Sequence, residues 1–216
     1  MDPLHFCIAV APLSVYLLIL GLLNLWGRPF LTTGARDAAA LGIALSGMII
    51  AGPMELFFPE EAALQFGGLV WLLLVAFYGL CVSLVVLLLK PRLVVYNMSA
   101  EQLRPVLTQV AIELDKSSRW IGDSLYIPSQ HVHLHMDSID WLRNIQLVAS
   151  GSRQSFEGWR RLETGLRSGL ATARVGPNLL GVPLLVSSGL LAAVAAVWML
   201  SEPQAVAQAL DEMLRR

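Results

Sequence analysis

Three histidines alternate with apolar residues just before Asp137, and no other segment of the chain groups potential metal ligands so closely. If this segment is a β-strand, residues two apart share a face, so the imidazoles and the carboxylate would lie together. The four side chains are those of His131, His133, His135 and Asp137. Imidazole nitrogens bind zinc, copper and nickel. The three histidine positions would span about 13 Å, so one ion would take two of them and a ligand from elsewhere.

This histidine segment leaves two interpretations open. In the first, it is a metal site or a proton sensor, and a transition metal is the only cofactor predicted for the chain. In the second, it is the polar face of an ordinary half-buried strand. Both interpretations place Val132, Leu134 and Met136 in a core.

Arginine recurs every seven residues in a second polar segment. The four positions are Arg153, Arg160, Arg167 and Arg174. On a helix this spacing returns to nearly the same face, so a basic stripe is predicted on a helix over residues 155–173. Basic residues close to a bilayer attract anionic headgroups by about 1 kcal/mol each. The stripe therefore predicts contact with anionic lipid or a partner protein, and a solvated helix face is the alternative.

Glu55 is the one ionisable residue well inside an apolar stretch. Acidic side chains within a membrane are candidates for function because burying a charge there is costly. Glu55 also lies only a few residues before Glu60, between Pro53 and Pro59. An ion or proton site and an ordinary interfacial carboxylate are both compatible with this position.

Four apolar stretches make up most of the remaining chain. Residues are 56% hydrophobic and 14% charged, whereas about 25% of residues are charged in soluble domains. The stretches cover residues 6–26, 38–58, 67–89 and 179–200, and each is long enough to cross a bilayer as a helix. Small residues four apart in the second and fourth stretches predict that these two helices pack together, and the bulkier third suits contact with lipid.

Basic residues near the apolar stretches predict the orientation in the membrane. They lie in the first loop and at the start of the polar segment, at Arg28, Arg36, Lys90 and Arg92. The second loop carries Glu60 and Glu61 instead. We therefore expect a multi-pass protein of a bacterial inner membrane with residues 91–178 in the cytoplasm. Both termini would lie outside, including a short amphipathic tail over 201–216.

The cytoplasmic segment shows both strand and helix periodicities. They predict the order β-α-β-β-β-α, with an antiparallel sheet and two helices on one face. The first helix begins with Ser99 and Gln102, which have the spacing of a capping box. The fold class is thus a four-helix membrane bundle with an inserted α+β module, a ferredoxin-like variant by element order alone.

The sequence predicts a scaffold rather than an enzyme. It contains no GxSxG, P-loop, HExxH or GxGxxG motif, and a net charge of −1 predicts no nucleic-acid partner. The leading hypothesis is a non-enzymatic accessory or scaffold subunit of a larger membrane complex, with the bilayer and other membrane subunits as partners. The alternatives are a metal- or pH-responsive regulator that uses the histidines, and an ion- or proton-conducting unit that uses Glu55.

Overall fold

The computed structural model describes residues 2–139, 143–151 and 154–215. The chain forms two compact units, each made of separate segments. The helical unit contains Met1–Gly21, Ala38–Leu88 and Val182–Arg216, and the sheet unit contains Leu22–Asp37 and Leu89–Gly181. The chain passes between the two units four times.

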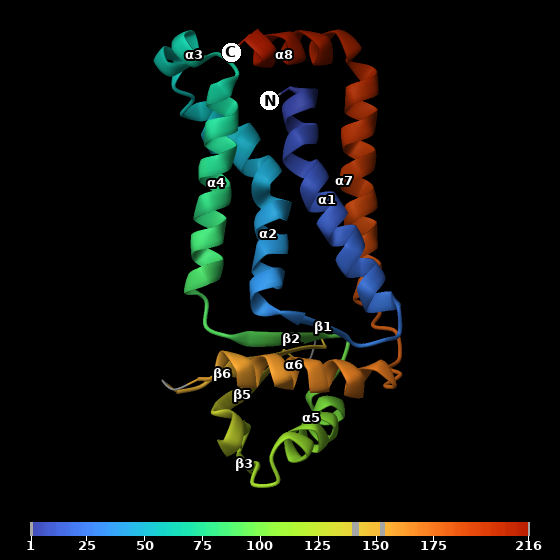
Figure 1. Cartoon of the computed structure of the whole chain (residues 1–216). Coiled ribbons are helices and arrows are strands. Elements are labelled where there is room, and N and C mark those ends of the chain that lie inside the picture. The colour runs from blue at the N-terminus through green and yellow to red at the C-terminus, as the bar shows by residue number, and fades with distance from the viewer. Residues whose placement is uncertain (1, 140–142, 152–153, 216) are drawn as a thin grey trace. The chain divides into compact units, whose positions relative to one another are not determined.

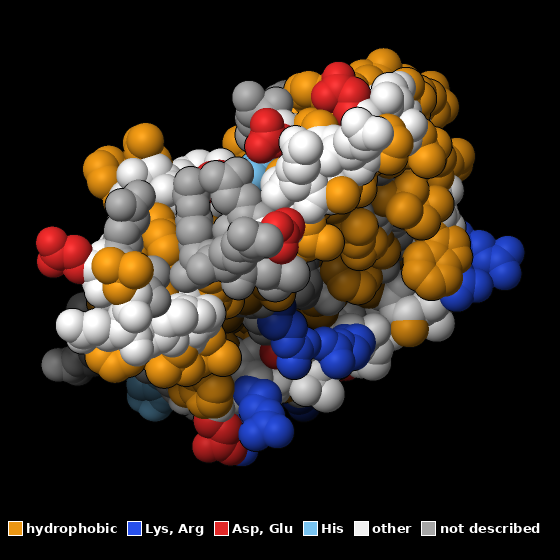
Figure 2. All heavy atoms as spheres, turned by 90° about the horizontal axis from the view of Figure 1, so that it is seen from above, with side chains coloured by type: hydrophobic (Ala, Val, Ile, Leu, Met, Phe, Trp, Pro, Cys, Tyr) orange, Lys and Arg blue, Asp and Glu red, His pale blue; other side chains and the backbone are white. Residues whose placement is uncertain are grey.

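The helical unit contains four long apolar helices, which stand out in Figure 1. They are α1 (Pro3–Leu25), α2 (Gly34–Ile49) with a π-helical turn η1 (Ile50–Met54), α4 (Leu69–Leu88) and α7 (Gly181–Ser201). Each is long and apolar enough to cross a membrane, as the sequence predicted. Two shorter helices are α3 (Glu60–Phe66) and α8 (Pro203–Arg215). Large hydrophobic side chains are exposed on the long helices, and hydrophobic atoms cover much of the surface seen in Figure 2.

Glycines bring α2 close to its neighbours. A Cβ atom on Gly47 would lie 2.0 Å from the carbonyl oxygen of Ile8 in α1. On the side toward α4, a Cβ atom on Gly42 would lie 2.7 Å from Val82, and the hydroxyl of Tyr78 donates to the Gly42 carbonyl at 2.7 Å. The small residues of α2 therefore allow close contact with both α1 and α4.

The contacts of α7 differ from the sequence prediction, which paired this helix with α2. The hydroxyl of Ser188 donates to the carbonyl oxygen of Ser14 in α1 at 2.8 Å, and the ring of Trp198 lies 5.5 Å from that of Phe6. Figure 1 shows α1 between α2 and α7. Ala192, one of the small residues four apart in the fourth stretch, is exposed. The small residues of α7 lie on more than one face, so their spacing alone did not identify the face that packs.

The sheet unit contains six antiparallel strands in the order β1-β2-β6-β5-β4-β3. Their bounds are β1 Phe30–Thr33, β2 Arg92–Tyr96, β3 Arg119–Ile121, β4 Ser124–Ile127, β5 Val132–Ile139 and β6 Asn144–Ala149. Its helices are α5 (Ala100–Leu114), the 3-10 turn η2 (Pro128–Gln130) and α6 (Phe156–Ala171). The first strand comes from the loop between the first two long helices, so the sheet is not made of residues 91–178 alone.

The predicted ferredoxin-like variant describes part of this topology. Helix α5 connects β2 to β3. These two strands run parallel to each other, and β6, β5 and β4 lie between them, as in a split βαβ unit. Two features differ from the prediction. The strands after α5 are four rather than three, and β1 pairs with β2 at the free edge of the sheet.

One core joins the sheet to both helices. Leu93, Leu147 and Met136 lie side by side on three neighbouring strands and contact α5 and α6 on the same face. The two helices pack closely because α6 carries glycine there, and a Cβ atom on Gly165 would lie 2.7 Å from Val110 of α5. The capping box of Ser99 and Gln102 is present at the start of α5. The predicted antiparallel sheet is therefore confirmed, and α5 and α6 share its core.

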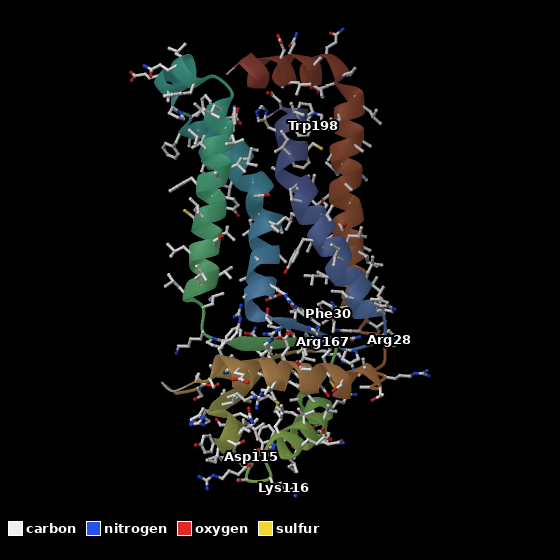
Figure 3. The ribbon with its side chains drawn as sticks, viewed as in Figure 1. Arg28, Phe30, Asp115, Lys116, Arg167 and Trp198 are labelled. Atoms are coloured by element: carbon white, nitrogen blue, oxygen red, sulfur yellow. The ribbon has the colours of Figure 1, made fainter. Side chains whose placement is uncertain are left out.

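Asp115 fixes the end of α5 to the turn between β4 and β5. Its carboxylate accepts hydrogen bonds from the backbone N–H groups of Ser129 and Ser117, both at 2.8 Å. The bonds from Ser129 and Ser117 stabilise the charged form and lower the pKa of Asp115 to about 2. Figure 3 labels Asp115 beside Lys116 at this end of the sheet unit.

Candidate functional site

The histidine segment forms β5, with the predicted alternation. Val132, Leu134 and Met136 are buried in the core, with Val132 and Leu134 at 0% exposure. His133 and His135 lie on the other face of the sheet. His131 does not join them, because it precedes the strand in the left-handed conformation, with φ 50°, at the end of η2. The prediction that all three imidazoles share one face was therefore wrong for His131.

His133 and His135 contact other residues of the sheet unit. The ring of His133 packs edge-on to Tyr126 at 5.7 Å. Its backbone N–H donates to the side-chain oxygen of Gln154 at 3.3 Å, and its carbonyl accepts from the Gln154 amide at 2.8 Å. Nδ1 of His135 lies 3.2 Å from the hydroxyl of Ser124. These contacts tie β5 to β4 and to the segment before α6.

A metal site would need a third ligand near His133 and His135. Asp137 lies further along the same face, opposite Gln146. Within residues 2–139, 143–151 and 154–215, no three side chains of His, Cys, Asp or Glu are grouped so that they could hold a metal ion. Metal binding stays a prediction, and no third ligand from the described residues supports it.

The predicted arginine stripe is not continuous. Helix α6 ends at Ala171, so Arg174 lies beyond it, and Arg153 falls outside the described residues. Arg160 and Arg167 are exposed on the helix, but Arg167 forms an ion pair with Glu163 at 2.9 Å. The same carboxylate lies 3.9 Å from Arg36. The charge of the stripe is thus partly neutralised.

Glu55 follows the π-helical turn η1 in the helical unit and has a histidine partner. Its Oε1 lies 3.0 Å from Nε2 of His5, and Nδ1 of His5 lies 3.5 Å from the carboxylate of Asp2. A histidine ring has two nitrogens, so His5 can contact both carboxylates at once. Single π-helical turns are frequent at functional sites. Sequence reasoning missed this pair because fifty residues separate its members.

A further surface of the sheet unit combines α5 with β3, and we call it the α5–β3 surface. It consists of Arg104, Thr108 and Ile112 on α5 and Trp120 on β3. The indole N–H of Trp120 donates to the hydroxyl of Thr108 at 2.9 Å, and the guanidinium of Arg104 lies 4.7 Å from the centre of the indole. Ile112 is 49% exposed on this surface, whereas Ile121, which follows Trp120 in β3, is 60% exposed on the opposite face of the sheet.

One signal in the sequence could have identified the α5–β3 surface. The buried positions of α5 include Leu103, Leu107, Val110 and Ala111, which lie on one side of the helix. Ile112 falls outside this apolar stripe, where a soluble helix usually carries a polar residue. The contact of Trp120 with Thr108 could not be predicted, because it depends on how the hairpin of β3 and β4 folds back on α5.

Comparisons with known proteins give no further assignment. No protein-family model matches the chain. No curated protein and no solved structure shows a significant match either.

Proposed function

We propose that this chain is a non-enzymatic scaffold subunit of a larger membrane complex, anchored by its four long helices. Its sheet unit would dock a partner protein on the α5–β3 surface. The observation that supports this most is the exposure of Ile112, one helical turn from Thr108, whose hydroxyl binds Trp120. Exposed apolar side chains on the long helices would be covered by lipid, but those of a folded sheet unit point to a protein partner.

The place of this surface in the sheet favours the proposal. The sheet unit is connected to the long helices on both sides of β1, before β2 and after α6. Strand β3 forms the opposite edge, five strand spacings from β1, which is roughly 24 Å. A partner at β3 would therefore bind at the edge of the sheet farthest from β1, the strand whose flanking residues lead to α1 and α2.

The side chains around Trp120 are already ordered by contacts within the sheet unit. Besides stacking on the indole, Arg104 donates to the carbonyl oxygen of Gly122 at 2.9 Å and lies 3.6 Å from the carboxylate of Asp123. Trp and Arg are enriched among the residues that dominate protein–protein binding energy. Because these side chains are already ordered, a partner would lose less conformational entropy on binding them.

The docking proposal is tested by purifying the tagged full chain from its native membrane in mild detergent and identifying bound proteins by mass analysis. We expect a stoichiometric partner with wild type and its loss with Ile112→Glu. Ile121→Glu is the matched control, because it makes the same change at an exposed isoleucine on the opposite face of the sheet from α5. Equal loss with both variants, or no stoichiometric partner at all, would contradict the proposal.

We also propose that the sheet unit lies in the cytoplasm and that both termini lie outside, as the basic residues indicate. In a chain with Cys7→Ala and Cys81→Ala, a single cysteine at Gln65 should react with an impermeant thiol reagent added to intact cells. A cysteine at Ser129 should react only after the membrane is opened. Both positions are exposed in the structure, so burial would not hide either one. The reverse pattern of labelling would contradict this orientation.

A further inference from the structure

Three arginines from distant parts of the chain meet at one junction of the sheet unit. The backbone N–H of Val175 donates to the carbonyl oxygen of Gly27 at 3.2 Å, and that of Asn178 donates to Asn24 at 2.9 Å. The segments 24–27 and 175–178 therefore run antiparallel. Arg28 follows the first segment and Arg174 precedes the second, so both lie at the same end of the junction.

The third arginine contacts the same junction. A guanidinium nitrogen of Arg143 donates to the carbonyl oxygen of Gly176 at 3.2 Å. The junction is firmly held, because the side chains of Asn24 and Asn178 are buried and hydrogen bonded to each other at 3.0 Å. We call Arg28, Arg143 and Arg174 the arginine corner, and Figure 3 labels Arg28.

The arginine corner lacks the neutralisation that other arginines of the sheet unit have. Five of them lie within 4.0 Å of a carboxylate: Arg36, Arg92, Arg104, Arg161 and Arg167. Among the described residues, no carboxylate lies within that distance of Arg28, Arg143 or Arg174. Like charges on adjacent segments repel one another, so an anion bound between them would be stabilised.

The position of the corner along the chain indicates which anion it meets. Arg28 lies three residues beyond the end of α1, and Arg174 lies seven residues before the start of α7. Three residues span at most about 10 Å. Trp26 and Leu179 between the corner and these helices are 69% and 76% exposed, as expected of side chains at a membrane interface. If α1 crosses the membrane, Arg28 lies within about 10 Å of the boundary of the span, at the depth of the headgroups.

We propose that Arg28, Arg143 and Arg174 bind the phosphate of an anionic lipid headgroup. A guanidinium group presents paired N–H donors that match two phosphate oxygens, so arginine suits this ligand better than lysine. The site replaces the predicted stripe along α6 as the basic surface for lipid, and Arg174 is common to both. It does not depend on the docking proposed for the α5–β3 surface.

The test uses the full chain, purified and delipidated in mild detergent. It is titrated with phosphatidylglycerol or with phosphatidylcholine of the same acyl chains, and bound lipid is counted by native mass spectrometry. Wild type should bind phosphatidylglycerol more tightly than phosphatidylcholine. In the double variant Arg28→Gln with Arg174→Gln, phosphatidylglycerol binding should weaken about 25-fold, since each basic residue near the headgroups contributes about a fivefold factor.

The matched control is Lys116→Gln with Arg160→Gln, which removes the same charge at two exposed positions outside the corner. It should bind phosphatidylglycerol as wild type does. Equal weakening in both double variants would overturn the proposal in favour of general electrostatic attraction. No preference of wild type for phosphatidylglycerol would also overturn it. Displacement of the lipid by millimolar inorganic phosphate, with saturable binding of that phosphate, would assign the corner to a soluble anion instead.

Discussion

Replacement of Gly47 by leucine is expected to separate α1 from α2 and to lower the yield and Tm of the protein sharply. A Cβ atom at this position would lie 2.0 Å from the carbonyl oxygen of Ile8 and 3.0 Å from that of Ala9. Both are backbone atoms of a helix, so neither can rotate away as a side chain could. Overpacked sites commonly lose about 1–3 kcal/mol, and a backbone clash of this kind should reach or exceed the upper end. Thermal unfolding in detergent measures the loss.

Two control substitutions separate this clash from general effects of leucine. Gly79→Leu also changes a glycine within a long apolar helix, but nothing lies within 4 Å of the position of its Cβ atom. Ala76→Leu adds the same side chain at an exposed position of α4. Both should fold with a Tm near that of wild type. If Gly47→Leu were tolerated as well as these two, the close contact between α1 and α2 would be disproved.

Truncation of Leu134 to alanine should have the largest effect among single changes in the sheet unit. Leu134 is fully buried between Leu125 and Ala149 on the neighbouring strands, below α5 and α6. Leucine-to-alanine changes at such sites lower the free energy of unfolding by about 2–5 kcal/mol, because apolar contact is lost and a cavity remains. Thermal unfolding of the full chain, followed by circular dichroism, measures the change.

His133→Ala is the natural comparison for Leu134→Ala, because it changes the adjacent residue on the opposite face. The backbone bonds of His133 to Gln154 remain, so we expect a change in the free energy of unfolding of only about 0.5 kcal/mol. A loss as large as that of Leu134→Ala would contradict the assignment of the two faces. The same variant also tests the histidine hypotheses. A chelator should lower the Tm of wild type but not of His133→Ala if the strand binds metal.

The features that local sequence patterns control were predicted well. The alternation from Val132 to Met136 identified both faces of β5, because side chains of a strand point alternately to opposite sides. The capping box at Ser99 and Gln102 was found for the same reason, since both partners lie within four residues. The four long helices follow from length and hydrophobicity alone.

The features that the sequence did not predict depend on partners far away in the chain. Strand β1 is only four residues long, and its pairing with β2 joins Leu31 to Val95. The contact of His5 with Glu55 needs α1 and α2 to pack with one particular register. For the arginines, the even spacing of seven suggested one helix face, whereas α6 ends before Arg174. Periodicity describes a single element and contains no information about which element lies next to it.

The pairing of Asn24 with Asn178 makes the assembly of this protein depend on synthesis of nearly the whole chain. The two residues are 154 positions apart. At about 5–20 residues per second, Asn24 leaves the ribosome roughly 8–30 s before its partner. During that interval the first three long helices can enter the membrane, while β1 remains unpaired until β2 has been made and the sheet remains incomplete until its other strands follow. The sheet unit therefore cannot close until residue 178 has been made, and a chain interrupted before Asn178 would keep its first loop exposed to quality-control proteases.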